Sequence, residues 1–364
     1  MKIDLKMFAD SLTDENIIDI MNHLGANNYE ETNSAIIFPT ICHNYDADEA
    51  SMKLYYYRGN KKFHCYTECD ANFNIYEMVR KRWALTKDYQ LSEIESSFSF
   101  RDILEFLFSV TGLREFDFHA EKDTYKSVRS KYKEKLPVRL NEYDEGRLEI
   151  FDKWYTPEWL QENISVASME KFNIRYSISQ NKIIIPHYNI NGKLIGIRGR
   201  ALNQEEIDSG CKYMPVKIEG KFYAHPLSLN LYGLDRNYKD IATSTTLFLF
   251  EGEKSVLLYD SYFPQCAAAA VCGSNLNKNQ IDILLKNFNL KEIVVCFDKE
   301  YVKYGTDESK KYFNKLYSLC ERYSMYYNFS FIFDMDDLLN EKDSPIDKGK
   351  ETFIKLYKKR IKVN

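Results

Sequence analysis

Acidic residues directly follow two short apolar runs of the sequence. Glu251 follows the run TLFLF at 246–250, and Asp298 and Glu300 follow the run IVVCF at 293–297. Short, continuous, β-rich runs are typical of strands buried on both faces of a parallel sheet. Ligands bind at the carboxyl ends of such strands, and clustered carboxylates repel one another unless a cation lies between them. The pattern therefore predicts a site for a divalent cation, and its oxygen ligands suit Mg²⁺.

A second group of residues has the chemistry of a zinc site. Cys42 and His43 are separated from Cys65 and Cys69 by a segment with two strand-like runs, a layout that predicts a zinc ribbon with one pair of ligands on each turn. Adjacent residues of a strand point to opposite faces, so Cys42 and His43 can both bind the ion only if the chain kinks there. Alternatives for the fourth ligand are His64, Asp46 and Asp48. A ribbon that folds without metal is the alternative to the site as a whole.

Bulk composition is that of an ordinary globular protein. The chain has 364 residues, 44% hydrophobic and 29% charged, which is enough for two or three domains. Because the net charge is −4, a nucleic-acid site would have to be a local basic patch. No apolar run approaches the roughly 18 residues of a membrane span, and the N-terminus has no signal-peptide pattern. We therefore expect a cytoplasmic protein without a membrane partner, with its cysteines mostly reduced.

The order of predicted elements divides the chain into four parts. Residues 1–112 mix helical and strand-like segments and are predicted to form the zinc-ribbon-like domain. One of its helices is predicted to begin after the cap Thr13, and another to end at Gly112. The charge-rich residues 113–150 are predicted to form a linker. Residues 151–242 read as α+β and contain two strand-like runs, 182–187 and 194–197, on either side of Asn191-Gly192, a pair that favours a hairpin turn. Residues 243–364 alternate strand and helix four times, which predicts an α/β domain with a four-stranded parallel sheet and right-handed crossovers.

The last part closely resembles the Toprim domain, which DnaG-type primases share with topoisomerases and some nucleases. The resemblance rests on Glu251-Gly252 after one strand and on Asp298-Lys299-Glu300 after a later one. It implies that Glu251 is a general acid or base or a metal ligand, and that Asp298 and Glu300 hold Mg²⁺ or Mn²⁺. Glu300 stands where the family has a second Asp. Asp343 resembles a later acidic position of primases and is the fourth implied metal ligand.

Two further parts of the sequence resemble DnaG-type primases. The Cys-His segment, with the run NFNIYEMV that follows it, resembles the N-terminal zinc-binding domain of the family. The segments Arg198-Gly199-Arg200, Lys212-Tyr213 and Leu231-Tyr232-Gly233-Leu234 resemble the start of the polymerase core, which implies that Arg200 and Lys212 are catalytic residues of the nucleotide groove. Cations there would offset the charge of template and triphosphate. The implied nucleic-acid and nucleotide ligands are Lys182, Arg198, Arg200 and Lys212.

The resemblance covers nearly the whole chain and implies a compact primase like those of phages and mobile elements of low-GC bacteria. Such an enzyme makes short RNA primers from ribonucleoside triphosphates on single-stranded DNA during replication, by two-metal phosphoryl transfer. The implied cofactors are Mg²⁺ or Mn²⁺ and Zn²⁺, and a replicative helicase is a further candidate partner. Two alternatives stay open: a Toprim nuclease, and a non-catalytic single-stranded-DNA-binding protein of a mobile element.

Overall fold

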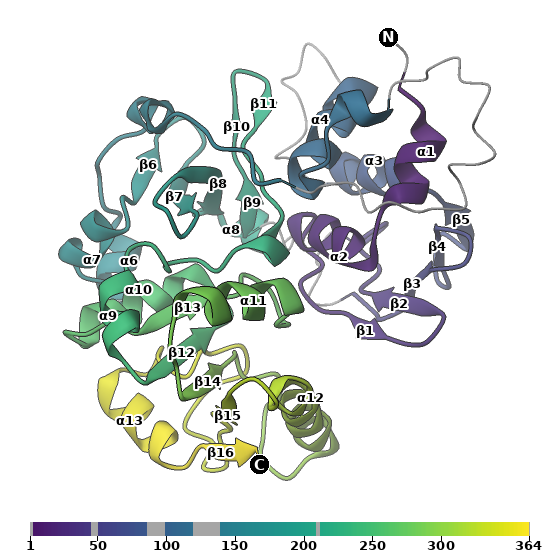
Figure 1. The fold of residues 1–364 in the computed structure, drawn as a ribbon. Helices are drawn as coiled ribbons and strands as arrows, with labels where there is room; N and C mark the ends of the chain where they lie inside the picture. The colour runs from purple at the N-terminus through teal and green to yellow at the C-terminus, as the bar shows by residue number, and fades with distance from the viewer. Residues whose placement is uncertain (1–2, 45–49, 86–98, 119–138, 209–211, 364) are drawn as a thin grey trace. The chain divides into compact units, whose positions relative to one another are not determined.

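The computed structural model describes residues 3–44, 50–85, 99–118, 139–208 and 212–363, and the chain forms two compact units (Figure 1). One unit comprises residues 1–142 and 195–226, and the other comprises 143–194 and 227–364. The four parts predicted from the sequence divide the chain by expected function and not by compactness. The two compact units therefore do not test their boundaries, which stay a prediction. Within the described ranges, no helix has the length and apolar character needed to cross a membrane.

The first unit contains an antiparallel sheet in the order β1-β2-β3-β4-β5. Its strands are β1 (Glu30–Glu31), β2 (Ala35–Phe38), β3 (Leu54–Tyr57), β4 (Lys62–Cys65) and β5 (Ala71–Phe73). The helical segments of this part are α1 (Leu5–Ser11), α2 (Asp14–His23), α3 (Ile75–Leu85), α4 (Phe100–Thr111) and η2 (Glu115–Phe118). Helix α2 begins at the predicted cap, because Thr13 and Asn16 form a reciprocal capping box. Helix α4 ends at Gly112, whose φ of 65° is left-handed.

A separate four-stranded sheet has the order β6-β7-β8-β9. Its strands are β6 (Arg175–Ser177), β7 (Lys182–Tyr188), β8 (Leu194–Ala201) and β9 (Tyr213–Pro215). The predicted runs are β7 and β8, and Gly192 between them has a φ of 74°, which glycine adopts without strain. Strand β8 is longer than the run 194–197 predicted, because residues 198–200 pair with β9. The division between the two compact units falls within this sheet, after Leu194.

The second unit contains the predicted α/β domain, with the sheet order β13-β12-β14-β15-β16 (Figure 1). Its strands are β12 (Thr246–Phe250), β13 (Ala268–Ala270), β14 (Glu292–Cys296), β15 (Asn328–Phe331) and β16 (Ile361–Val363). The first four are parallel, as predicted. The four predicted parallel strands are confirmed, and the chain adds a fifth strand, β16, antiparallel to β15. Strand β16 has three residues and follows a helix. So short a run does not show the alternation of apolar and polar side chains that identifies a strand in a sequence.

Helices cover both faces of this sheet. Side chains alternate along β12, so Leu247 and Leu249 pack into a core with α11 (Lys278–Asn287) and α12 (Asp307–Tyr323). Phe248 faces the other way. Its ring lies 5.1 Å from that of Tyr259 in α10 (Glu253–Tyr262) and 5.6 Å from that of Phe353 in α13 (Lys350–Lys358). Burial on both faces is the reason why these strands read as continuous apolar runs.

The order of the parallel strands reverses at β12. The chain passes from β12 to β13 on one side and then returns to β14 on the other side of β12. The two crossovers use α10 and α11 on opposite faces, the combination that keeps both right-handed. In open α/β sheets, ligands bind beyond the carboxyl ends of strands at such a reversal. Glu251 after β12 and Asp298 after β14 therefore occupy the position where a ligand site is expected.

Several short elements complete the described chain. They are α8 (Gln204–Asp208), β10 (Lys217–Ile218) and β11 (Lys221–Phe222) in the first unit, and η3 (Glu145–Ile150), α6 (Pro157–Gln161), α7 (Val166–Lys171), η4 (Leu227–Leu229) and α9 (Tyr238–Thr243) in the second. Tyr232 exchanges backbone hydrogen bonds of 2.9 and 3.0 Å with Ala270 of β13, so the segment around it pairs with one edge of the sheet. Most of the predicted linker, from 119 to 138, lies outside the described residues.

Candidate functional site

Glu251, Asp298 and Glu300 lie close enough together for their charges to act on one another. Burial, together with the charges of Asp298 and Glu300, raises the pKa of Glu251 well above its usual value of 4.5. Burial and the same three carboxylates also raise the pKa of the Tyr312 hydroxyl. That hydroxyl donates a hydrogen bond of 2.5 Å to the main-chain oxygen of Asp298. The residues predicted from the ends of two separate strands are therefore brought together.

Two lysines only partly offset this negative charge. Lys315 Nζ lies 2.8 Å from Glu300 Oε1, and Lys315 and Lys342 both act to lower the pKa of Glu251. The raised pKa of Glu251 shows that burial and the two neighbouring carboxylates outweigh them. A divalent cation placed among the three carboxylates would remove this repulsion, so the electrostatics fit the predicted ion.

The carboxylates nevertheless form an open arrangement. Across the described residues, two groups of His, Cys, Asp or Glu bring all their ligand atoms within 4.8 Å of one another, and the group of Glu251, Asp298 and Glu300 is not among them. Mg²⁺ is usually bound through one or two carboxylates, with water and substrate phosphates completing its octahedron. An open set of carboxylates fits that mode of binding and does not fit a closed cage.

Asp343 lies beside this group through its backbone. Its carbonyl oxygen accepts a 2.9 Å hydrogen bond from the amide of Lys299, which places the loop next to the Asp298–Glu300 segment. Its side chain accepts from the amide of Asn340 at 2.7 Å and pairs with Lys348 at 3.2 Å. In this structure the Asp343 carboxylate stabilises its own loop, and its role as a metal ligand stays a prediction.

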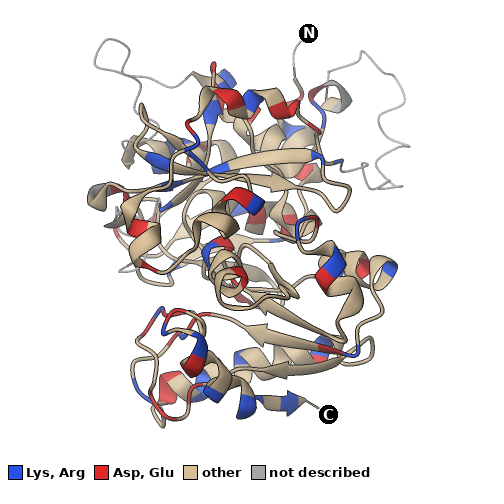
Figure 2. Cartoon of the chain, turned by 90° about the vertical axis from the view of Figure 1, so that its left-hand side faces the viewer, with Lys and Arg blue, Asp and Glu red and all other residues tan. Residues whose placement is uncertain are grey.

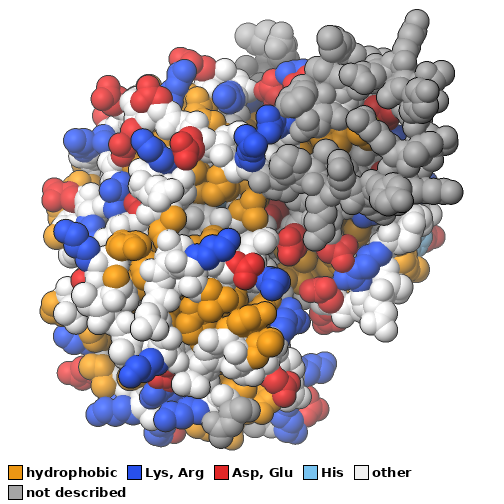
Figure 3. Space-filling view, in the orientation of Figure 1, with side chains coloured by type: hydrophobic (Ala, Val, Ile, Leu, Met, Phe, Trp, Pro, Cys, Tyr) orange, Lys and Arg blue, Asp and Glu red, His pale blue; other side chains and the backbone are white. Residues whose placement is uncertain are grey.

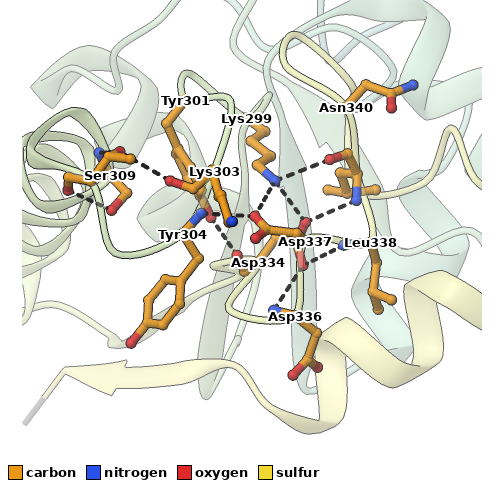
Figure 4. Close-up of polar contacts among 12 residues, drawn as sticks. Lys299, Tyr301, Lys303, Tyr304, Ser309, Asp334, Asp336, Asp337, Leu338 and Asn340 are labelled. Atoms are coloured by element: carbon orange, nitrogen blue, oxygen red, sulfur yellow. Dashed lines mark hydrogen bonds and ion pairs between the residues drawn. The ribbon is translucent and has the colours of Figure 1, made fainter.

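Lys299 is a residue of this site that the sequence reasoning did not single out. Its side chain is 2% exposed, and its ammonium group lies 3.1 Å from Asp334, 3.1 Å from Asp337 and 3.0 Å from the carbonyl oxygen of Leu339 (Figure 4). The carboxylate of Asp334 also accepts hydrogen bonds from the amides of residues 336, 338 and 339. Asp334 and Asp337 therefore hold the loop after β15 onto Lys299.

The three consecutive residues have different partners. Asp298 and Glu300 act on Glu251, while Lys299 between them reaches the loop after β15. The available signal for Lys299 was the alternation of side chains that is expected where a strand continues. A lysine between two acids reads as a solvated charge unless the fold supplies buried acids for it.

The cysteine cluster, in contrast, is a closed set of ligands. The ligand atoms of Cys42, His43, Cys65 and Cys69 all lie within 4.8 Å of one another. His43 Nδ1 is 3.3 Å from the sulfur of Cys42, 3.6 Å from that of Cys65 and 3.4 Å from that of Cys69, and the sulfurs of Cys42 and Cys69 are 3.8 Å apart. Tetrahedral Zn²⁺ with its usual bond lengths places sulfur and nitrogen about 3.6 Å apart and two sulfurs about 3.8 Å apart. The four residues fit a zinc ion.

The required kink is present in the backbone. Residues 41–43 form a turn, closed by hydrogen bonds from the amides of His43 and Asn44 to the carbonyl oxygen of Thr40. Among the alternative ligands, His64 Nδ1 lies 3.1 Å from the Asn72 side chain and is outside the cluster. Asp46 and Asp48 lie outside the described residues.

The surroundings of the cluster favour a bound cation. Burial and the neighbouring Cys65 and Cys69 raise the pKa of the Cys42 thiol, so the thiolates needed for binding repel one another without an ion. Burial also opposes ionisation of Cys65, but hydrogen bonds from Thr67, the backbone of Cys69 and the side chain of Cys42 together outweigh it and lower the pKa of Cys65. The Thr67 hydroxyl lies 3.3 Å from His43 Nε2, which orients the ring with Nδ1 towards the sulfurs.

The predicted basic residues are divided between the two units. Arg200 lies on β8 opposite Tyr213, and the carbonyl oxygen of Lys212 accepts from the amide of Ala201, so Arg200 and Lys212 are brought together in the first unit. Arg198 is two residues from Arg200, and its guanidinium lies 5.6 Å from the Tyr213 ring. Lys182, in the second unit, is buried in β7. The roles of all four residues stay predictions.

Charges of both signs are interspersed in the two views of the described residues. Figure 2 shows basic and acidic residues mixed along the helices and loops, and Figure 3 shows the same mixture around apolar areas on one face. The described part of that face carries no extended basic area that would bind any polyanion regardless of its structure.

Comparison with known proteins gives the family of the chain. The chain is 34% identical to the SPbeta prophage-derived uncharacterized protein YorJ of Bacillus subtilis (strain 168), over all of its own length and 98% of that protein. It belongs to the same family as YorJ. No protein-family model matches the chain.

The resemblance to DNA primases is also confirmed. The chain is 28% identical over 134 residues to the DNA primase of Buchnera aphidicola subsp. Acyrthosiphon pisum (strain APS) and 32% identical over 83 residues to the DNA primase of Enterobacteria phage T4. These matches cover 37% and 23% of this chain, and they span only 22% and 21% of the two primases.

Solved structures of primases are similar to the chain at low identity. A DnaG primase catalytic domain bound to single-stranded DNA aligns at 16% identity and a TM-score of 0.44, covering 60% of this chain and 77% of that one. The zinc-binding and RNA polymerase domains of the Aquifex aeolicus primase align at 17% identity and a TM-score of 0.38, covering 97% and 87%.

Proposed function

We propose that the protein is a DNA-templated RNA primase that makes short primers from ribonucleoside triphosphates on single-stranded DNA. The observation that carries the proposal is the group of coupled carboxylates at the ends of two neighbouring parallel strands, β12 and β14. The closed Cys-His cluster and the sequence shared with two DNA primases support it.

In this proposal Glu251, Asp298 and Glu300 hold Mg²⁺ or Mn²⁺, and Asp343 joins them if its loop releases the side chain. Cations bound there would activate the primer 3′-hydroxyl and stabilise the leaving pyrophosphate. The raised pKa of Glu251 also fits a group that takes part in proton transfer.

The remaining predicted residues have supporting roles in this proposal. Arg200 on β8 and Lys212, whose carbonyl oxygen accepts from the amide of Ala201, would neutralise template and triphosphate charge, and so would Arg198 and Lys182. The zinc module of Cys42, His43, Cys65 and Cys69 would bind single-stranded template. A replicative helicase would be the partner that delivers this template.

A primer-synthesis assay tests the proposal. The purified chain is incubated with a single-stranded DNA template, labelled ribonucleoside triphosphates and Mg²⁺ or Mn²⁺, and we expect short labelled RNA. The substitutions Glu251→Gln and Asp298→Asn should each reduce synthesis by roughly 10²-fold or more, as expected when a preorganised charge is removed. Asp307→Asn is the matched control, because Asp307 is an exposed carboxylate at the start of α12, and it should leave the rate unchanged.

The same assay distinguishes the two alternatives. Cation-dependent cutting of labelled DNA without nucleotide incorporation would contradict the primase and support a Toprim nuclease. Binding of single-stranded DNA with neither reaction would support a non-catalytic DNA-binding protein. Synthesis that persists in both active-site variants would show that the proposed carboxylates are not the catalytic ones.

A further inference from the structure

A second closed group of potential metal ligands lies inside the second unit. It consists of His187 on β7, Glu253 at the start of α10 and Cys272 just after β13, and their ligand atoms all lie within 4.8 Å of one another. His187 Nε2 is 3.1 Å from Glu253 Oε1, and the two side chains are only 1% and 2% exposed. Cys272 is also buried. These residues come from three segments that are distant in the sequence.

A fourth polar side chain points towards this group. The ring of Tyr232 lies 4.9 Å from the His187 ring, and the hydroxyl is buried with no hydrogen-bond partner among the described residues. Burial and, after it, the charges of Glu253, Asp235 and Cys272 raise the pKa of this hydroxyl. An imidazole, a carboxylate, a thiol and a phenol therefore meet in a space closed to solvent.

Burial of the Tyr232 hydroxyl is costly, because a buried hydroxyl without a hydrogen bond loses its solvation without replacement. A divalent ion bound to the imidazole, the carboxylate and the thiol would provide a partner for this phenol. Nitrogen and sulfur ligands select borderline or soft transition metals and are poor ligands for Mg²⁺, and Zn²⁺ accepts mixed nitrogen, sulfur and oxygen ligands in a tetrahedron.

We propose that His187, Glu253 and Cys272, with Tyr232 as the fourth ligand, bind a structural transition-metal ion of the Zn²⁺ type. This site is distinct from the Cys42 cluster, which belongs to the other unit. It is also distinct from the carboxylates of Glu251, Asp298 and Glu300, whose ligands are all oxygen.

The position of this site gives it a consequence for the neighbouring carboxylates. The amide of Cys272 donates a 2.8 Å hydrogen bond to the carbonyl oxygen of Glu251, and Glu253 lies two residues further along the same turn into α10. Cys272 has a φ of 59°, a conformation that a non-glycine residue keeps only where its surroundings enforce it. An ion bound to Cys272 and Glu253 would fix the backbone on both sides of Glu251.

Metal analysis of the full-length chain tests the proposal without reference to any activity. Protein produced in Zn²⁺-supplemented medium and freed of loosely bound ions is analysed for metal per chain, and one equivalent is expected for each of the two closed groups. The variants Cys272→Ser and His187→Asn should each lose one equivalent and keep the other. Cys296→Ser is the matched control, because Cys296 is a buried thiol outside both groups, and it should keep both.

Cobalt substitution of the wild-type chain gives a second measurement that does not depend on a variant folding. Titration of metal-free protein with Co²⁺ should develop thiolate-to-cobalt absorption in two steps, a strong one from the three cysteines of the Cys42 cluster and one of about a third of that strength from Cys272, since the band grows with the number of bound thiolates. A single equivalent of metal in the wild-type chain, with a single step, would overturn the proposal. Retention of both equivalents by folded Cys272→Ser would overturn it as well.

Discussion

The two sites that the sequence predicted for metals differ in how complete they are in the folded chain. Around Cys42, four ligand atoms already lie at the distances of a tetrahedron, and Thr67 orients the histidine. At Glu251 the carboxylates share an electrostatic field, but their oxygens do not close into a cage. A closed set fits an ion that stabilises the fold, whereas an open set leaves room for a substrate to complete the coordination.

The difference follows from the elements that carry the ligands. Cys42 and Cys69 lie on turns and Cys65 at the end of β4, where a few residues determine the position of each side chain. The carboxylates lie at the ends of separate parallel strands. Lys299, between two of them, holds the loop after β15 through Asp334 and Asp337. The first site is therefore determined locally, and the second depends on the packing of the whole domain.

The largest effect on stability is expected when the Cys42 cluster loses its metal ion. Because the binding free energy of a structural zinc ion is also folding free energy, roughly 10 kcal/mol in small zinc domains, Cys65→Ser or prolonged chelation should abolish cooperative unfolding of the first unit. Circular dichroism during thermal denaturation and metal analysis measure this. His64→Ala is the control and should keep the metal, since His64 contacts Asn72. Loss of metal in that variant, with retention in His43→Ala, would show that the fourth ligand is wrongly assigned.

A smaller loss of stability is expected at Lys299, which holds the loop after β15 beside the carboxylate site. Lys299→Met leaves the Asp334 carboxylate, which is 1% exposed, without its cation, and we expect a loss of about 3–5 kcal/mol in the free energy of unfolding. Urea denaturation measures this loss. The double variant with Asp334→Asn should recover part of it, because the uncompensated charge is gone. Purely additive losses would mean that the two side chains are not coupled.

The pH dependence of stability tests the repulsion at Glu251. The folded chain keeps a proton on Glu251 above pH 4.5, where the unfolded chain loses it, so without divalent cations this group lowers the stability as the pH rises. Glu251→Gln should therefore be more stable than the wild type at about pH 8, and the difference should vanish as the pH falls below the unfolded pKa. Denaturation curves at several pH values measure this difference. Mg²⁺ should stabilise the wild type and not the variant, and a Glu251→Gln variant that is less stable at every pH would contradict the open, repulsive site.

The smallest effect is expected at Glu300. The pair with Lys315 is partly exposed, with side chains 22% and 34% accessible, and such pairs contribute about 0–1 kcal/mol. Glu300→Asp should therefore change stability by less than about 1 kcal/mol. If Glu300 is a metal ligand, the shorter side chain should shift the Mg²⁺ concentration that gives half-maximal primer synthesis. Lys315→Met breaks the same pair without touching a carboxylate, and an equal shift in that variant would mean that the pair, and not Glu300 as a ligand, is responsible.

The sequence by itself determined the elements whose signals are local. The apolar run of β12 is found at the predicted residues, the cap of α2 at Thr13 and the end of α4 at Gly112. Placement of Glu251 and Asp298 after parallel strands followed from the same local pattern. Each of these features depends on residues within a few positions of one another, whose spacing alone limits the conformations that the backbone can adopt.

Only the tertiary structure decided the features that join distant segments. The partners of Lys299 lie 35 and 38 residues further along the chain, and β16 forms because β15 offers it a free edge. Glu253 begins α10, yet its side chain meets His187 across 66 residues. Spacing along the chain carries no record of such contacts, because they arise when the packing of the sheet and its helices removes the side chains from water and leaves them only one another as partners.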